Sequence, residues 1–161
     1  MIFPFFSRAL FRDDEIALVP SREDVRSTRL GIRDGYTLNI YLRKTRHCIG
    51  YVSLRVGESP ALYYLGHIGY RIDPPYRGHG YAARACEMII PLIRELNLKS
   101  LCITADPDNT PSRKTCERIG CELESIARVP VTYLEVCAGS QYKCRYIWRI
   151  PDPDKGGTSC R

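Results

Sequence analysis

The clearest pattern along the chain is an alternation of apolar and other side chains with a period of two. Between residues 37 and 43 every second residue is apolar, and the segment 142–150 repeats the alternation. A strand that is buried on one face has this period, because its successive side chains point to opposite faces. A polar turn at 44–46 and a second apolar run at 49–56 therefore predict a hairpin.

Apolar runs bounded by turn residues predict the remaining elements. Short strands are expected at 15–19, 65–73, 101–105 and 121–129, a turn at 57–60, and helices at 81–97 and between the turn 106–111 and Gly120. Pro91 lies inside the first helix and should kink it, because proline removes one backbone hydrogen bond. A strand, a helix and a strand in this order place the two strands side by side and parallel.

These elements predict a single α/β domain over residues 1–150, built on a central mixed, mostly antiparallel sheet with flanking helices. The chain has 161 residues, 44% of them hydrophobic, which suffices for one core. Residues 151–161 are rich in Pro, Asp and Gly, and we expect a disordered tail there. No apolar stretch approaches the roughly 18 to 20 residues of a membrane-spanning helix, so no membrane partner is expected.

The number and placement of the cysteines indicate the cellular compartment in which the protein is expected. The chain has eight cysteines, several of which fall inside predicted strands and helices. A domain of this size does not need disulfides for stability, and the apolar N-terminus lacks the features of a signal peptide, so we expect reduced thiols and a cytoplasmic location. No C-x-x-C pair occurs and the three histidines lack metal-ligand spacing, so no metal site is expected.

The net charge of +6 raises the question of nucleic-acid binding. Four arginines follow a candidate helix cap at Ser21 with a spacing of three or four: Arg22, Arg26, Arg29 and Arg33. On a helix this spacing would form one face, which could bind phosphates or simply face solvent. We favour the solvated face, because no known DNA or RNA motif accompanies the arginines, and we expect no nucleic-acid partner.

A glycine-rich loop, Arg77-Gly78-His79-Gly80-Tyr81-Ala82, joins a predicted strand to a predicted helix. Backbone N–H groups and the positive end of the helix dipole meet at such a turn, which suits a pyrophosphate. Any tight strand-to-helix turn can also use glycine, so the loop alone leaves a structural role open. The nucleotide P-loop and the dinucleotide fingerprint G-x-G-x-x-G are both absent.

Two segments carry a family resemblance. Residues 72–82 resemble the acetyl-CoA signature of the GNAT N-acetyltransferases, and residues 109–121 are similar to that family's second conserved stretch. The resemblance covers about residues 36–150, and within the family it extends to the branch that includes the ribosomal-protein alanine acetyltransferases. It implies the GNAT fold, with the sheet splayed between its two parallel strands, and an acyltransferase that uses acetyl-CoA as cosubstrate.

The resemblance also assigns residues to acetyl-CoA. It implies that the pantetheine arm pairs with backbone groups of Tyr70, Arg71 and Ile72. It implies that the pyrophosphate binds the backbone of Arg77, Gly78, His79, Gly80, Tyr81 and Ala82. Asn109 and Ser112 would lie near the thioester, and Asn109 is also a candidate helix cap, a role compatible with the first.

Catalysis is less clearly indicated. Many members of the family place a tyrosine seven residues after the asparagine, as the acid that protonates the departing thiolate, and here that position is Cys116. Cys116 is either that acid or a small core residue. His67 has the reference pKa of a base near neutrality, but a packed strand histidine is an equal alternative. Other relays are water and the residues Glu122, Glu124 and Tyr146.

We therefore expect an N-acetyltransferase that passes an acetyl group from acetyl-CoA to a primary amine by direct attack, with Cys116, His67 and Asn109 as the catalytic candidates. The acceptor is either a small molecule or a protein N-terminus. A non-catalytic acyl-CoA-binding module is the alternative, because the usual tyrosine is missing. Homodimers are common in the family, so the expected partners also include a second copy.

Overall fold

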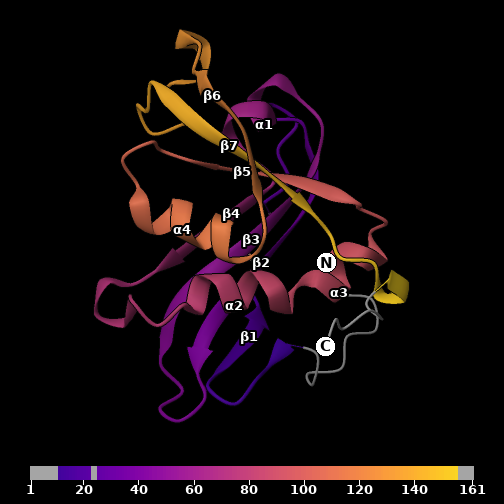
Figure 1. Cartoon of the computed structure of the whole chain (residues 1–161), viewed down its shortest axis with the longest axis vertical. Helices are drawn as coiled ribbons and strands as arrows, with labels where there is room; N and C mark the ends of the chain where they lie inside the picture. The colour runs from indigo at the N-terminus through magenta and orange to yellow at the C-terminus, as the bar shows by residue number, and fades with distance from the viewer. Residues whose placement is uncertain (1–10, 23–24, 156–161) are drawn as a thin grey trace, which may run out of the picture.

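The computed structural model of this protein describes residues 11–22 and 25–155. Within them, one seven-stranded sheet runs in the order β1-β2-β3-β4-β5-β7-β6 (Figure 1). The strands are β1 (Ile16–Pro20), β2 (Ile32–Leu42), β3 (Cys48–Gly57), β4 (Ile68–Ile72), β5 (Ser100–Ala105), β6 (Glu122–Arg128) and β7 (Tyr142–Arg149). Only β4 and β5 pair in parallel; every other neighbouring pair of these strands is antiparallel. The expected mixed, mostly antiparallel sheet is therefore confirmed.

Helices cover both faces of the sheet. The helices α2 (Tyr81–Met88), α3 (Ile90–Glu95) and α4 (Thr110–Arg118) pack on the face whose buried side chains form the main core, including Leu38, Ile103 and Trp148. Helix α1 (Pro60–Leu65) contacts β5 through Thr104, whose hydroxyl donates to the Tyr64 carbonyl at 2.9 Å. Because successive side chains of a strand alternate, Thr104 points away from Ile103, and α1 lies on the opposite face.

The predicted helix over the arginines after Ser21 is wrong. Ser27 and Ile32 instead form an isolated antiparallel bridge around a tight turn, and Arg33 lies within β2. Two local features favour the turn: Gly31 has a φ of 70°, and the Ser27 hydroxyl accepts from the Leu30 amide at 3.3 Å. The four arginines therefore do not share a helix face.

The segment expected as a turn and the start of a strand contains a short helix. Ser59 caps α1 by accepting from the Leu62 amide at 3.1 Å, and Pro60 occupies a first-turn position that needs no N–H donor. Strand β4 consequently begins at Ile68 rather than at Leu65. Six residues were too few to show a helical period in the sequence.

The helix expected at 81–97 is interrupted, as its proline predicts. Helix α2 ends at Met88, α3 begins at Ile90, and Pro91 sits in the first turn of α3. At that position the missing N–H costs no hydrogen bond. The helix before Gly120 and the other predicted strands are confirmed, although β2 begins at Ile32 rather than at Thr37.

At the C-terminal end, Pro153–Lys155 form a 3-10 turn, and the Arg94 side chain donates to the Pro151 carbonyl at 3.0 Å. The rest of the predicted tail lies outside the described residues. In the described part of the chain no helix is long and apolar enough to cross a membrane. The same residues contain no cluster of three or more potential metal ligands, and the seven cysteines among them are free thiols.

Candidate active site

The site begins where the two parallel strands separate. Strands β4 and β5 share a single register pair, Ile68 with Ile103. Beyond Ile68, residues 70–72 pair with β3 on one edge, and no ladder joins their other edge to β5. The sheet is thus open from Tyr70 onward, and backbone groups on this edge of β4 are available to a ligand.

The glycine-rich loop lies at the end of β4 and opens α2. Gly78 and Gly80 have φ angles of 87° and 72°, in the left-handed region that favours glycine. A Cβ atom added to Gly78 would meet nothing within 4 Å, so packing does not explain this glycine. Gly80 is the N-cap of α2, and no side chain caps the first turn. The first-turn amides of α2 therefore have no side-chain cap, as an anion site requires.

Two arginines flank the loop. Arg77 donates from Nε to the Ile72 carbonyl at 2.8 Å, which ties the loop to the end of β4. The guanidinium of Arg118, at the end of α4, lies so close to Gly80 that a Cβ atom there would clash with it. Arg118 was not among the predicted site residues, because nothing in its sequence context indicates that α4 ends beside the loop. It adds positive charge to the first turn of α2.

The side chains of the loop itself differ in exposure. His79 is exposed, and its ring lies beside that of Tyr81 with 5.3 Å between centroids. Tyr81 and Ala82 are half-buried. Arg71, on β4, is exposed and forms an ion pair with Asp73 at 3.8 Å.

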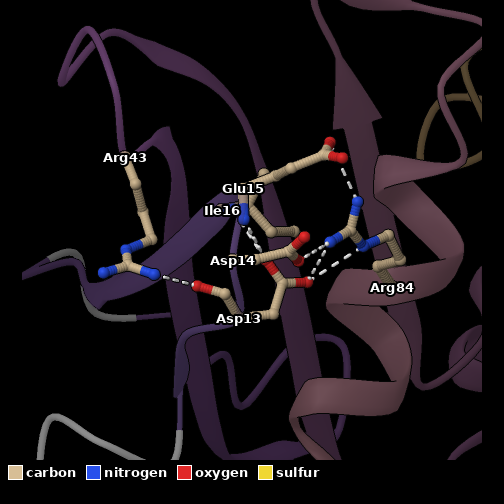
Figure 2. Close-up of polar contacts among 6 residues, drawn as sticks. All are labelled: Asp13, Asp14, Glu15, Ile16, Arg43 and Arg84. Carbon is tan, nitrogen blue, oxygen red and sulfur yellow. Dashed lines mark hydrogen bonds and ion pairs between the residues drawn. The ribbon is translucent and has the colours of Figure 1, made fainter.

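An acidic segment anchors α2 to the N-terminal part of the sheet (Figure 2). The Arg84 guanidinium forms ion pairs with Asp13 at 2.6 Å, Asp14 at 2.9 Å and Glu15 at 3.0 Å. Burial acts to raise the pKa of Asp13, but the amides of Ile16 and Glu15 and the Arg84 guanidinium together hold that pKa below its usual value. Arg84 is thereby neutralised and positions the helix that follows the loop.

On the other side of the opening, α4 presents Asn109 and Ser112. Asn109 caps α4, because its side-chain oxygen accepts from the Ser112 amide at 3.2 Å. Ser112 faces β4: the Tyr70 hydroxyl lies 2.9 Å from its Oγ and donates to its carbonyl at 3.0 Å. Tyr70 therefore links β4 to α4 through its side chain.

Cys116 is fully buried on α4, with 0% of its surface exposed. Its Sγ lies 3.6 Å from the Tyr70 hydroxyl. Hydrogen bonds from the Cys121 thiol and from Tyr70 lower the pKa of Cys116, against the effect of its burial. The structure thus brings Cys116 close to the opening but leaves it no exposed surface.

His67 connects three strands. The Cys102 amide donates to its Nδ1 at 3.0 Å, so the ring proton is on Nε2, which donates to the Gly57 carbonyl at 3.2 Å. Burial lowers the pKa of His67, although Glu58, 3.8 Å away, acts in the opposite direction. Both ring nitrogens are engaged, which is the packed, hydrogen-bonded arrangement that the sequence left open.

The other candidate relays are also paired. Arg145 donates to Glu124 at 2.8 Å and stacks on the ring of Tyr63, 3.5 Å from its centroid. The hydroxyl of Tyr146 accepts from Arg113 at 3.0 Å. Glu122 forms an exposed ion pair with Arg149 at 3.8 Å. Of these relays, Glu124 lies on the face of α1, because Arg145 is opposite Thr104 in the β5–β7 ladder.

A sheet opened between two parallel strands, with an uncapped helix N-terminus beside the opening, defines a coenzyme-binding α/β domain. The family comparison agrees: residues 6–122 match the acetyltransferase (GNAT) domain. The chain therefore belongs to the GNAT family of acetyltransferases, and the predicted family and fold are confirmed.

Individual relatives are more distant. Over 58 residues the chain is 34% identical to the uncharacterized N-acetyltransferase YnaD of Bacillus subtilis (strain 168), a match that covers 35% of this chain and 34% of YnaD. Among solved structures, the ribosomal-protein-S5-alanine acetyltransferase of Vibrio fischeri is 23% identical with a TM-score of 0.59, and the match covers 73% of this chain and 63% of that one. The microcin C7 self-immunity acetyltransferase MccE, solved with acetyl-CoA and AMP, is 22% identical with a TM-score of 0.56, over 72% and 61% of the two chains. This chain thus spans less than two thirds of these relatives.

Proposed function

We propose that this protein transfers the acetyl group of acetyl-CoA to a primary amine of a small molecule or a protein N-terminus. The observation that carries the proposal is the opening between β4 and β5, which lies next to the uncapped first turn of α2. A thioester arm can enter the opening while the pyrophosphate binds the turn. MccE, which has the same fold, was solved with acetyl-CoA.

Acetyl-CoA would bind mainly to backbone groups. The amides of residues 77–82 would hold the pyrophosphate, with Arg118 adding charge beside Gly80. The free edge of β4 at Tyr70, Arg71 and Ile72 would pair with the pantetheine arm. Asn109 would act indirectly, because its side chain caps α4 and so sets the position of Ser112.

The amine would attack the thioester carbonyl directly. Attack requires a neutral amine, and the departing thiolate requires a proton. For His67 to accept the amine proton, it would have to give up its hydrogen bond to Cys102, because Nε2 already carries a proton. This geometry favours a structural role for His67 and makes solvent the better acceptor of that proton.

Binding is tested through Gly78. A valine at Gly78 would place its side chain in the open space where we expect the pyrophosphate, without meeting other protein atoms within 4 Å at Cβ. Acetyl-CoA at a hundred times its Kd should stabilise the natural protein by about 2.7 kcal/mol, and Gly78→Val should lose this stabilisation in thermal unfolding.

Gly139 provides the matched control. Its φ is 79° and a Cβ atom there also meets nothing within 4 Å, but it lies in the connection between β6 and β7. Gly139→Val therefore introduces similar backbone strain while leaving the loop intact, and it should keep the stabilisation by acetyl-CoA. If Gly78→Val keeps it too, the proposed pyrophosphate site is wrong.

The second candidate function is a non-catalytic acyl-CoA-binding module. It is favoured by one observation, that Cys116 is buried at the position where the family places its acid. Mass spectrometry of acetylated products from a panel of amines separates the two functions; the panel holds amino acids, polyamines, aminoglycosides and peptides with a free N-terminus. We expect turnover of at least one class. Tight acetyl-CoA binding without any acetylated product would favour the module.

A further inference from the structure

The site contains a hydroxyl group that the family's usual pattern does not place there. Tyr70 extends from β4 to α4, and its hydroxyl lies within hydrogen-bonding distance of three groups on that helix. These groups are the Ser112 carbonyl at 3.0 Å, the Ser112 Oγ at 2.9 Å and the Cys116 Sγ at 3.6 Å. Tyr70 thus brings a phenol close to Cys116, the position on α4 where many members of the family have a tyrosine.

Exposure separates the hydroxyls from the thiol. Cys116 has no exposed surface, whereas Tyr70 and Ser112 are both partly exposed. A group that stabilises a leaving group by a hydrogen bond must reach it. Tyr70 and Ser112 keep some exposed surface for such a contact, whereas Cys116 has none.

We propose that Tyr70 and Ser112 act as a hydroxyl pair that donates to the sulfur of the departing CoA, replacing the family's tyrosine on α4. The inference rests on the proposed function. When the amine nitrogen attacks, the carbonyl carbon–sulfur bond breaks and its electron pair stays on sulfur. The hydroxyl pair hydrogen-bonds to the resulting thiolate but keeps its own protons, because the pKa of Tyr70 is raised further above that of a thiol. The attacking nitrogen releases one proton to solvent, and the sulfur takes one up from solvent, so the step balances.

The environment of Tyr70 fits a donor. Burial raises the pKa of Tyr70, and the nearby Cys116 thiol acts in the same direction, so the phenol stays protonated at neutral pH. Hydrogen bonds to a charged acceptor are stronger than those between neutral groups, so a thiolate gains more from this pair than a thioester does. The interaction thus increases as the C–S bond breaks, which is the requirement for catalysis.

The first test does not require the acceptor. It compares the binding of CoA and of dethio-CoA, which lacks the thiol, by calorimetry from pH 6.5 to pH 9.5. Donors that favour the thiolate lower the pKa of the bound thiol, so CoA binding should tighten by about tenfold over this range relative to dethio-CoA. Tyr70→Phe should remove most of this difference, and Ser112→Ala should reduce it.

Tyr36→Phe controls for the loss of a tyrosine hydroxyl, because Tyr36 donates to Asp34 at 3.0 Å on β2, away from the opening. It should retain the pH dependence of the natural protein. An unchanged ratio of CoA to dethio-CoA binding in Tyr70→Phe would overturn the proposal. The proposal would also be overturned if Cys116→Ala lost the pH dependence of CoA binding and Tyr70→Phe kept it, since Cys116 would then be the donor.

The second test uses any amine that the panel identifies. Tyr70→Phe should lower kcat by about 10²-fold while the KM for acetyl-CoA changes less than twofold, because a hydrogen-bond donor placed at the developing charge contributes roughly this much. Activity within twofold of the natural protein would count against the proposal. If no amine is acetylated but the pH-dependent CoA binding is found, the transferase function fails while the hydroxyl pair stands.

Discussion

At the scale of single residues, burial and hydrogen bonding decide which polar groups are available for chemistry. His67 and Cys116 were both chosen for their reference pKa values and their places in the chain. In the structure, His67 uses both ring nitrogens to join β3, β4 and β5, and Cys116 is enclosed. Tyr70 was expected only as a backbone contact, but its side-chain hydroxyl contacts Ser112 on α4. Sequence position alone does not reveal such pairings.

The pH dependence of stability tests the role of His67. Its folded-state pKa is below the unfolded value near 6.5, because it is buried as a neutral ring. The unfolded chain therefore binds a proton first as the pH falls, and the stabilisation is present above pH 6.5 and is lost progressively below it. We expect urea midpoints to fall between pH 7 and pH 5, and His67→Gln to flatten this change.

His79→Gln is the control, because His79 is exposed in the loop. It should leave the pH profile of the urea midpoint as it is in the natural protein. A profile that stays the same in His67→Gln would show that His67 is solvated in solution and remains available as a base.

At the scale of elements, strong alternation predicts strands well and short segments poorly. Strands β3 and β7 were expected within one residue at each end, whereas β2 begins at Ile32 rather than at Thr37. Alternation predicts a strand where one face is buried, because burial then fixes the period of two. Helix α1 was missed, and the arginine helix was wrong. Both segments are short, and a single cap or a glycine with positive φ decides their conformation.

Arg84 tests how α2 is held. Replacing Arg84 by alanine removes the ion pairs with Asp13, Asp14 and Glu15 (Figure 2). Because the guanidinium is partly exposed, solvent screens these pairs, and we expect a loss of about 1 kcal/mol in the free energy of unfolding by urea. The loss should diminish at high salt, since exposed charges are screened.

The exposed Arg128 on β6 is the matched control for a change in net charge. Arg128→Ala should change the free energy of unfolding by less than about 0.5 kcal/mol, as surface substitutions usually do. Equal effects of the two substitutions would mean that the acidic segment does not anchor α2.

At the scale of the whole molecule, the crossover from β4 through α2 and α3 to β5 produces the site. It brings two parallel strands together at one pair, leaves them apart beyond it, and delivers the glycine loop to the same edge. Helix α4 then closes the other side with Asn109 and Arg118. Tyr70 and Ser112, which are 42 positions apart in the chain, meet there, and local sequence patterns do not show such a contact.

Hydrogen exchange tests this arrangement in the complete protein. Acetyl-CoA should slow exchange at the amides of residues 78–82 and on the free edge of β4, because these groups would gain hydrogen-bond partners from the ligand. Exchange in the β1–β2 ladder should change little, since it lies far from the opening in the strand order. Mass spectrometry of peptides with and without the ligand provides the measurement. Equal protection throughout would indicate general stabilisation rather than this site.

The amino-acid sequence by itself determined the periodic strands, the crossover unit and the loop, because these depend on local periodicity and on glycine at defined points. The two segments 72–82 and 109–121 were enough to indicate the family. The tertiary structure alone decided that Tyr70 meets Ser112, that Arg118 lies beside Gly80 and that Cys116 is enclosed. The physical reason is that hydrogen bonds and burial at the site depend on side chains from distant elements, and their distances are set only when the sheet and helices pack together.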